Sequence, residues 1–576
     1  MASRLLSAAL ISMTACAGDQ HFRLRDPMLV DSDLRPVTMP CRTVKDKDKD
    51  KDKEVCTPEE YYSPLAWDGA DNLFFRIFSN FWFFEAESES VNANDFDEVP
   101  NSAWFTNRIG EKKMSLEDLA QGACPESPDL DTDVPDGSWV IDQGKSNGST
   151  PGFRVRIDGK KYLLKTDAPE QPDRATAASA IGAAMYHAVG FYTSCERVTY
   201  IKPSLLKLAE GLMQTDNTGA TTAFDQAALE KVLAFATKKD GMVRLQVSHW
   251  LPGRLIGPFR YESTRDDDPN DVIDHEDRRE LRGARLLAAW INHFDAREQN
   301  SIDSWIAIDS KNADSSPGIV RHYYLDMSDS FGAEWAWDKI SKRIGHSYYF
   351  DMAHVAEDYI TFGAIERPWD RAARLPGLEL FGYFHWHDFD PETWHVGYSN
   401  YAFSKMTERD GAWMARILAR FGPDELRALI SAGKFSDPKA ADWLWGTLHE
   451  RLRLILDRYL TRLSPVTDVT VEGTNLCGLD LGHLRGVRPA AEFVPSARIL
   501  GPDWKVVGEG QARYDGDQLC VTLAYDPALS GPDDALARYR VVRISNGVAP
   551  GPLEVHLYDL GPAKGFRIAG LARPPE

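Results

Sequence analysis

Two alternating segments joined by a tight turn restrict the fold of this chain more than any other feature. Phe153, Val155 and Ile157 alternate with two arginines, which is the period of a half-buried β-strand. An Asp-Gly pair at 158–159 is typical of a two-residue hairpin turn, and an apolar pattern resumes at Tyr162–Lys165. We therefore expect an antiparallel hairpin whose second strand ends on a lysine.

Further strand and helix patterns surround this hairpin. Apolar runs predict strands at Trp139–Ile141, Val198–Ile201 and Val243–Val247. Apolar residues at helical spacing predict helices at Asp173–Val189 and Asp274–His293. Because these patterns lead into a helical region and then into strands again, we expect an α+β fold.

The second half of the chain separates into a helical part and a β-rich part. The clearest helical periodicity lies at Ala412–Phe421, Pro423–Ile430 and Ala440–Leu463. After Asp468, short alternating runs between Gly and Pro residues predict a small β-sandwich-like module. These runs are Leu519–Leu523, Tyr539–Ile544 and Leu553–Leu557.

Changes in composition divide the chain into six parts. They are a signal peptide with a lipidation cysteine (1–16), a flexible charged tether (17–58), an aromatic-rich segment (59–137), a β-rich lobe (138–250), a helical lobe (251–465) and a β-rich module (466–576). The tether contains the run KDKDKDKDKE at Lys45–Glu54, which has no apolar residue to nucleate a core. Most aromatic residues of Tyr61–Phe84 are expected to pack in a core, whereas Trp104 and Phe105 look exposed.

The overall composition excludes two classes of protein. The 576 residues correspond to about three to five domains of ~100–200 residues. No run of about 18 apolar residues is present, so we expect no helix that spans a bilayer. The net charge of −21 argues against broad nucleic-acid binding, which needs clustered Lys and Arg to neutralise phosphates.

The first sixteen residues resemble an export signal. Arg4 is followed by the short apolar stretch Leu5–Met13, and small residues precede Cys16 as in a bacterial lipobox. An ordinary secretory signal cut near Ala17 is the alternative. Lipid on Cys16 would hold the protein on a membrane, since each buried methylene contributes ~0.8 kcal/mol. The residue after the cysteine is Ala17 rather than Asp, which resembles the sequence of lipoproteins sent to the outer membrane of a Gram-negative cell envelope.

Six cysteines remain beyond Cys16, an even number that permits disulfides outside the cytoplasm. Cys41–Cys56 would close a short loop around the charged run. Cys477–Cys520 would lie within the C-terminal module. Cys124 and Cys195 are expected either to pair or to remain buried thiols.

Several residues in the middle of the chain suit phosphoryl transfer. Gly144, Gly148 and Gly152 belong to a small-residue loop between two predicted strands, where backbone N–H groups can approach a polyphosphate. Lys165 ends the hairpin and could bind phosphates of ATP. A strand-end lysine that reaches out to solvent is the ordinary alternative.

The segment that follows the helix Asp274–His293 is the most specific motif. It reads HFDAREQN, with Asp295, Arg297 and Asn300 at the spacing HxDxxxxN. A hydrophobic strand then ends in Asp326. Phosphotransferases use such groups to accept a hydroxyl proton, to steady the γ-phosphate and to bind Mg²⁺.

The order of these features resembles the protein-kinase fold, over roughly 138–332. The sequence pattern is closer to that of atypical kinases of the HipA-like and lipid-kinase-like branch than to that of ordinary protein kinases. The resemblance implies a two-lobed body with a small β-rich lobe (138–250) and a larger helical lobe (251–465). It further implies ATP and Mg²⁺ as cofactors, with Asp295, Lys165 and Arg297 catalytic, Gly144, Gly148, Gly152 and Lys165 nucleotide-binding, and Asn300 and Asp326 metal-binding.

A second resemblance concerns the location of the protein and implies no activity. The segments EVPNSAWFTNR (98–108), PGFRV (151–155) and NHFDAREQN (292–300) are similar to those of lipoproteins from soil-dwelling Gram-negative bacteria.

Two departures from the kinase pattern favour an alternative function. The predicted helix Asp173–Val189 carries no Glu to pair with Lys165, although Glu196, Asp167 or Glu170 could replace it. ATP is also scarce outside the cytoplasm. The alternative is a non-catalytic pseudokinase-like surface lipoprotein that binds a protein or glycan partner.

A metal-dependent hydrolase is a third, weaker interpretation. It would be built on the acidic clusters. Separately, the segment 385–395 has the donor types for a metal site, and its Trp and Phe residues favour instead an aromatic loop docked on the helical domain. The donors in that segment are His385, His387, Asp388 and His395.

Overall fold

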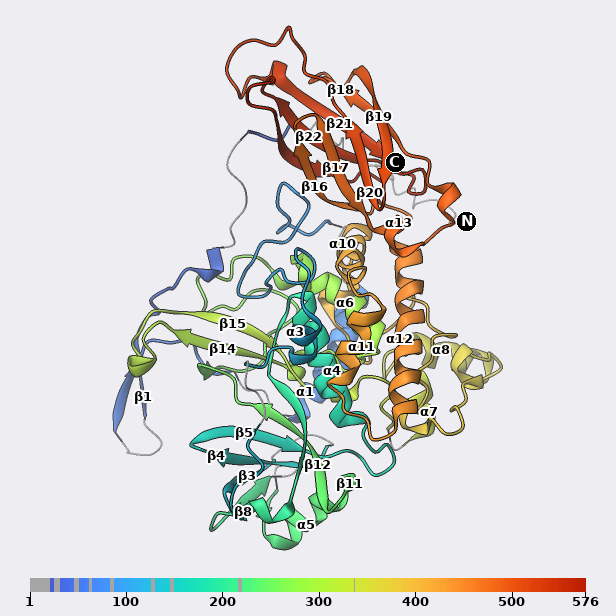
Figure 1. Cartoon of the computed structure of the whole chain (residues 1–576). Coiled ribbons are helices and arrows are strands. Elements are labelled where there is room, and N and C mark those ends of the chain that lie inside the picture. Colours follow the sequence, from blue (N-terminus) through green and yellow to red (C-terminus); the bar gives the residue numbers. More distant parts are fainter. Residues whose placement is uncertain are drawn as a thin grey trace, which may run out of the picture.

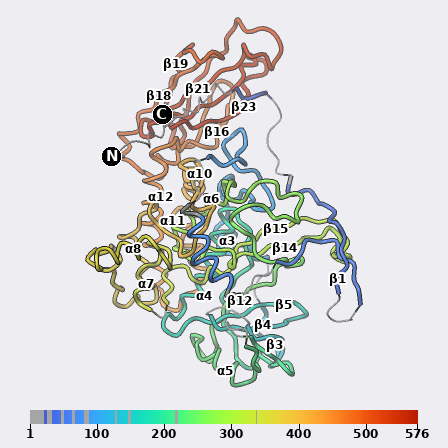
Figure 2. The backbone as a smooth tube through the Cα atoms, turned by 180° about the vertical axis from the view of Figure 1, so that it is seen from behind, coloured from blue at the N-terminus to red at the C-terminus, as the bar shows by residue number. Residues whose placement is uncertain are grey.

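The computed structural model describes residues 21–24, 32–45, 51–61, 65–82, 88–125, 130–145, 150–215, 220–335 and 337–575. It shows an α+β protein, as predicted. A small sheet and a C-terminal β module lie at opposite ends, and helices fill the space between them (Figure 1). Figure 2 shows the same arrangement from behind.

The predicted hairpin forms the centre of a seven-stranded sheet. Its strands β4 (Gly152–Ile157) and β5 (Lys160–Lys165) pair antiparallel, with Ile157 opposite Lys160. The order is β11-β12-β5-β4-β3-β8, and β7 also pairs with β12. The other strands are β3 (Trp139–Gly144), β7 (Glu196–Ile201), β8 (Leu206–Leu208), β11 (Lys238–Lys239) and β12 (Met242–His249).

One face of this sheet buries an apolar core. Phe153, Val155 and Leu164 are fully buried there, which matches the alternation in the sequence. A short helix, α5 (Gln226–Ala234), contributes Leu229 to this core. The hairpin of β9 (Met213–Thr215) and β10 (Thr221–Ala223) lies beside it.

Two buried helices position the middle of the molecule. Helix α4 (Arg174–Val189) is rich in alanine and passes close to the segment after β15, where Gly182 leaves room for Met327. Helix α6 (Arg279–Ile291) is preceded by a 3-10 turn, so it begins five residues later than predicted. Around them lie α3 (Leu116–Gln121), α7 (Asp338–Arg343), α8 (Met352–Thr361), α9 (Tyr401–Ser404), α10 (Glu408–Leu418), α11 (Pro423–Ser431) and α12 (Pro438–Tyr459).

A four-stranded sheet extends from α6. Its order is β13-β14-β15-β6, and β14 and β15 form an antiparallel hairpin. The strands are β6 (Tyr192–Thr193), β13 (Arg254–Leu255), β14 (Ser301–Ala307) and β15 (Gly318–Tyr324). Strand β14 therefore begins directly after Asn300, and β15 ends two residues before Asp326.

The C-terminal module is an eight-stranded antiparallel sheet, which confirms the β-rich prediction. Its order is β16-β17-β20-β19-β18-β21-β22-β23, and β16 approaches β23, so the sheet nearly closes on itself. The strands are β16 (Val466–Glu472), β17 (Asn475–Asp480), β18 (Ser496–Leu500), β19 (Val506–Asp515), β20 (Gln518–Thr522), β21 (Tyr539–Ser545), β22 (Leu553–Asp559) and β23 (Phe566–Ala572). One short helix, α13 (Leu481–Arg485), follows β17.

The N-terminal region differs from the expected tether. The described ends of the charged run form an antiparallel hairpin, β1 (Arg42–Lys45) with β2 (Asp52–Val55). Before it, residues 21–24 lie on the C-terminal module, where the backbone N–H of Phe22 donates to the Tyr539 hydroxyl at 3.0 Å. Between these two segments, the backbones of Val37 and Gly318 exchange hydrogen bonds at 2.9 and 3.1 Å, so the region is attached to the body at two places at least.

All six cysteines beyond Cys16 form disulfides. Cys41–Cys56 closes the charged hairpin and Cys477–Cys520 joins neighbouring strands of the module, as predicted. Cys124 pairs with Cys195, so of the two alternatives that the sequence left open the disulfide is the one that forms.

The two aromatic segments behave oppositely to expectation. Trp104 and Phe105 are 2% and 0% exposed, and Trp104 stacks on His322 with ring centroids 3.4 Å apart. In the earlier segment, helices α1 (Leu65–Ala70) and α2 (Arg76–Trp82) leave Trp67 and Phe75 more than half exposed. Whether such an aromatic side chain is buried depends on which part of the folded chain packs against it.

Across the described ranges, no helix has the length and apolar character needed to cross a bilayer. The predicted signal peptide and Cys16 lie outside the described residues.

Candidate functional site

Lys165 and Asp326 are in direct contact. The Lys165 ammonium lies 2.9 Å from Asp326 Oδ1, although the two residues are 161 positions apart. Lys165 ends β5 and is only 5% exposed. Asp326 follows β15 in a left-handed conformation (φ 53°), and its Oδ1 also accepts a hydrogen bond from Ser328. The pair joins the seven-stranded sheet to the helical part of the molecule.

A second carboxylate lies near the same lysine. Glu196, at the start of β7, acts electrostatically on Lys165 and is itself buried in a network of donors. Its oxygens accept hydrogen bonds from Ser194, Gln246 and Ser248 at 2.5–2.7 Å. Of the three carboxylates expected as possible partners of Lys165, Glu196 is therefore the one that acts on it electrostatically, although no ion pair joins the two among the described contacts.

The other two replacement carboxylates do not reach Lys165. Asp167 is buried against Thr176 and Arg244. Glu170 is exposed. Helix α4 contributes Ser179 instead, whose hydroxyl donates to Gln246 at 2.9 Å.

The HFDAREQN segment forms a compact, hydrogen-bonded loop after α6. Asn300 Nδ2 donates to both the main-chain oxygen and Oδ2 of Asp295, each at 2.7 Å. Arg297 Nε lies 3.0 Å from Asp295 Oδ1, and its guanidinium stacks over Tyr398. His293 is buried against the Tyr186 hydroxyl, and burial lowers its pKa to about 4. His293 is therefore a neutral structural residue at pH 7.

Electrostatics link this loop to Asp326. Burial, together with Asp329 and Asp326, raises the pKa of Asp295 to about 7, against the opposing effects of Arg297 and Asn300. Burial and the neighbouring Asp326 also raise the pKa of Asp329. At Asp326, burial is the largest single effect, but Lys165, Lys145 and Ser328 together outweigh it and hold the pKa of that carboxyl well below its usual range. Three carboxylates therefore share one desolvated region.

Asp329 and Arg174 are parts of this site that the sequence did not reveal. Arg174 begins α4, and its guanidinium donates to the main-chain oxygens of Ser328 and Ser330 at 2.6 and 3.0 Å. It thereby fixes the turn that carries both Asp326 and Asp329. The sequence offered one signal for Asp329, its position three residues after Asp326, and none for Arg174.

The glycine loop is described only at its two ends. Gly144 and Gly152 fit because a side chain would collide with Gln214 and with the Leu164 carbonyl, so both are explained by packing. Gly148 lies outside the described residues. Between them, Lys145 donates to the Thr150 carbonyl at 2.6 Å, and burial and the nearby Lys165 lower its pKa to about 8.

No three His, Cys, Asp or Glu side chains are arranged to enclose a metal ion in the described part of the chain. This removes the segment 385–395 as a metal centre. His385 instead bonds to the Ala373 carbonyl, and His387 stacks on Trp386.

Comparison with known proteins gives no relative: no family model, no curated protein and no solved structure matches this chain.

Proposed function

We propose that this protein is an atypical kinase-like phosphotransferase that moves a phosphoryl group from Mg-ATP to a hydroxyl acceptor. The observation that carries the proposal is the 2.9 Å contact of Lys165 with Asp326, beside the bonded pair Asp295–Asn300. These four residues were selected from the sequence for complementary roles in one reaction. Their assembly from distant parts of the chain supports a shared site.

The arrangement of elements supports the same proposal. In protein kinases the phosphate-binding lysine lies on the third strand of the small lobe, and the catalytic Asp and Asn follow in the larger lobe. Lys165 ends β5, which follows β3 and β4 in the seven-stranded sheet. We therefore propose the two-lobed body, with the boundary near residue 250.

Asp295 suits the role of the group that orients the acceptor hydroxyl and takes its proton. A general base works best with a pKa close to the ambient pH, and burial raises the pKa of Asp295 to about 7. Arg297, 3.0 Å away, remains positively charged and would steady the transferring phosphoryl group. Lys165 would exchange its contact with Asp326 for phosphate oxygens.

The oxygen donors fit Mg²⁺, although three acidic ligands are not assembled. Mg²⁺ prefers oxygen ligands and often uses only one or two carboxylates, completed by water and substrate phosphates. Asp326 and the amide oxygen of Asn300 would hold it. When bound, Mg²⁺ neutralises charge on the phosphates.

For location, we propose a lipid anchor on Cys16 in the cell envelope of a Gram-negative bacterium, on the outer membrane. The support is the lipobox-like sequence alone. Three disulfides agree with an oxidising compartment.

A pseudokinase-like platform for a protein or glycan partner is the second candidate. It is favoured by the helix α4, which carries no glutamate to pair with Lys165. This candidate shares the fold and differs only in chemistry.

A nucleotide titration separates the two. Thermal unfolding of the full chain is followed with ATP and Mg²⁺, for the wild type and for Asp326→Asn. A ligand at about 100 times its Kd stabilises the folded protein by ~2.7 kcal/mol. We expect a Mg²⁺-dependent shift that Asp326→Asn removes and that Asp503→Asn, an exposed control in the C-terminal module, retains.

Transfer is then measured with Asp295→Asn. If the protein is an enzyme, this variant binds Mg-ATP but loses phosphoryl transfer and slow ATP hydrolysis. Absence of any nucleotide shift in the wild type would overturn the phosphotransferase and leave the platform.

A further inference from the structure

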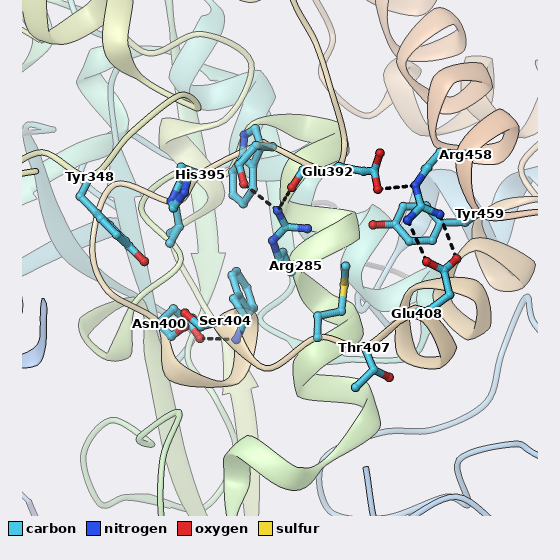
Figure 3. Close-up of a pocket in the computed structure, with 14 residues that line it drawn as sticks. Arg285, Tyr348, Glu392, His395, Asn400, Ser404, Thr407, Glu408, Arg458 and Tyr459 are labelled. Carbon is cyan, nitrogen blue, oxygen red and sulfur yellow. Dashed lines mark hydrogen bonds and ion pairs between the residues drawn. The ribbon is translucent and has the colours of Figure 1, made fainter. Parts of the chain in front are cut away.

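A pocket lies on the helical part of the molecule, and neither Lys165 nor Asp326 lines it. Its volume is about 430 Å³, within the range of about 300–1,000 Å³ typical of small-molecule sites. It lies between α6, α12 and the segment 392–408, and Figure 3 shows the side chains around it. None of the residues proposed for phosphoryl transfer lines it.

Arg285 occupies the middle of this pocket (Figure 3). Its guanidinium donates to three main-chain oxygens, those of Pro391, Glu392 and Trp394, at 2.8–3.2 Å. These contacts are neutral, and no carboxylate of the described residues lies within ion-pair distance of Arg285. Its charge is therefore matched by no ion pair in a largely desolvated position. Burial has the largest effect and lowers the pKa of Arg285, although Tyr459 and, from a greater distance, Asp390 favour the charged form.

A neighbouring part of the lining carries the reverse imbalance. Arg458 contacts two carboxylates, Glu392 at 2.6 Å and Glu408 at 2.8 and 2.9 Å (Figure 3). One guanidinium between two carboxylates leaves a net negative charge. The Glu392 and Glu408 side chains are 46% and 33% exposed, so they remain accessible from the pocket.

The rest of the lining is uncharged. Burial lowers the pKa of His395, which keeps its ring neutral at pH 7. Phe403, Met406 and Val396 supply apolar surface, and Ser404 adds a hydroxyl. The pocket therefore has a positive centre, a negative wall and an apolar part.

We propose that this pocket binds a small zwitterion of the size of a free amino acid. Its carboxylate would lie against Arg285, its ammonium against Glu392 and Glu408, and its side chain against Phe403 and Met406. A zwitterion compensates both imbalances at once, whereas a purely anionic or cationic ligand would compensate one and worsen the other. The proposal stands independently of phosphoryl transfer.

Calorimetric titration of the full chain with three matched sets of probes tests the charges. Each set holds an amino acid, its N-acetyl derivative and its amide, for leucine, phenylalanine and glutamine. We expect at least one free amino acid to bind, and both of its derivatives to bind at least tenfold more weakly. Failure of all three amino acids to bind, or equal binding of the derivatives, would overturn the proposal.

Two variants place the binding in the pocket. Glu408→Gln keeps the shape and removes one charge, so we expect tenfold weaker binding of the free amino acid and little change for its N-acetyl derivative. Asp442→Asn is the control, because Asp442 is an exposed carboxylate on the same helix as Arg458 and also faces an arginine. Unchanged amino-acid binding by Glu408→Gln, or an equal loss in Asp442→Asn, would refute the placement.

Discussion

Two buried aspartates illustrate how differently the C-terminal module and the candidate site treat charge. Asp480 in the module is fully buried and accepts hydrogen bonds from two backbone N–H groups, from Tyr514 and from Asn546. Asp295 is also buried, but its neighbours include two further carboxylates, Asp326 and Asp329. One carboxylate stabilises its surroundings, and the other is held in an unfavourable environment.

This difference distinguishes a buried carboxylate that serves the fold from one of the kind expected at a functional site. A buried charge that serves the fold is surrounded by donors until its desolvation is offset. Crowded carboxylates with shifted pKa values persist where chemistry requires them, and they are a mark of functional sites. The following predictions test whether the two regions really differ in this way.

The largest effect is expected at Asp480. Asp480→Ala leaves four donors without their acceptor, at ~1–3 kcal/mol for each that stays buried, so we expect a loss of about 4 kcal/mol or more in the free energy of unfolding. Urea unfolding measures it. Asp515→Ala, an exposed aspartate in the same sheet, should change little. If Asp480→Ala changed the free energy of unfolding only slightly, Asp480 would not be the stabilising carboxylate that distinguishes the module from the candidate site.

Asp295 should give a pH-dependent effect. Its pKa is raised to about 7, so its contribution to stability is complete below about pH 4 and is lost as the pH rises through 7. Asp295→Asn removes this loss. We expect the variant to gain about 2–3 kcal/mol on the wild type between pH 5 and pH 8, from ~1.4 kcal/mol for each of the roughly two pH units over which the wild type loses this contribution. A constant difference across this range would contradict the raised pKa.

Lys165→Met should cost about 2 kcal/mol, because Asp326, whose side chain is 34% exposed, loses its cation and solvent replaces only part of that interaction. Adding Asp326→Asn in the double variant should recover most of this loss, since no charge then remains uncompensated. Additive losses in the same unfolding measurements would show that the two residues do not act as a pair.

The smallest effect is expected at Ser248. Glu196 is a carboxylate of the site that is satisfied in the manner of Asp480, by three donors. Ser248→Ala removes one of them and should cost about 1 kcal/mol in chemical unfolding. Ser431→Ala, at an exposed serine, is the control, and an equal cost in both would show that Glu196 gains nothing from the network.

The sequence predicts local structure well wherever side-chain period decides it. The hairpin at 152–165 and the helices α4, α11 and α12 lie where the patterns placed them. It also selected Lys165, Asp295 and Asp326, because rare combinations of charged residues at strand and helix ends carry information of their own.

What the sequence could not give are contacts between distant surfaces. Nothing local shows that Trp104 stacks on His322 while Trp67 remains exposed. The Cys124–Cys195 bond and the role of Arg174 likewise depend on how α4 is placed. The dipolar pocket at Arg285 arises from three segments that share no motif.

The position of Phe22 has a consequence for how the chain is made. Its ring rests against Gly570 in the last strand, where any side chain would collide with it, and Tyr558 donates to its carbonyl at 3.0 Å. The first described residues therefore find their partners only after nearly the whole polypeptide has been synthesised. A chain that stops before β23 would leave this apolar segment uncovered, and we expect such a truncated chain to be cleaved faster by proteases.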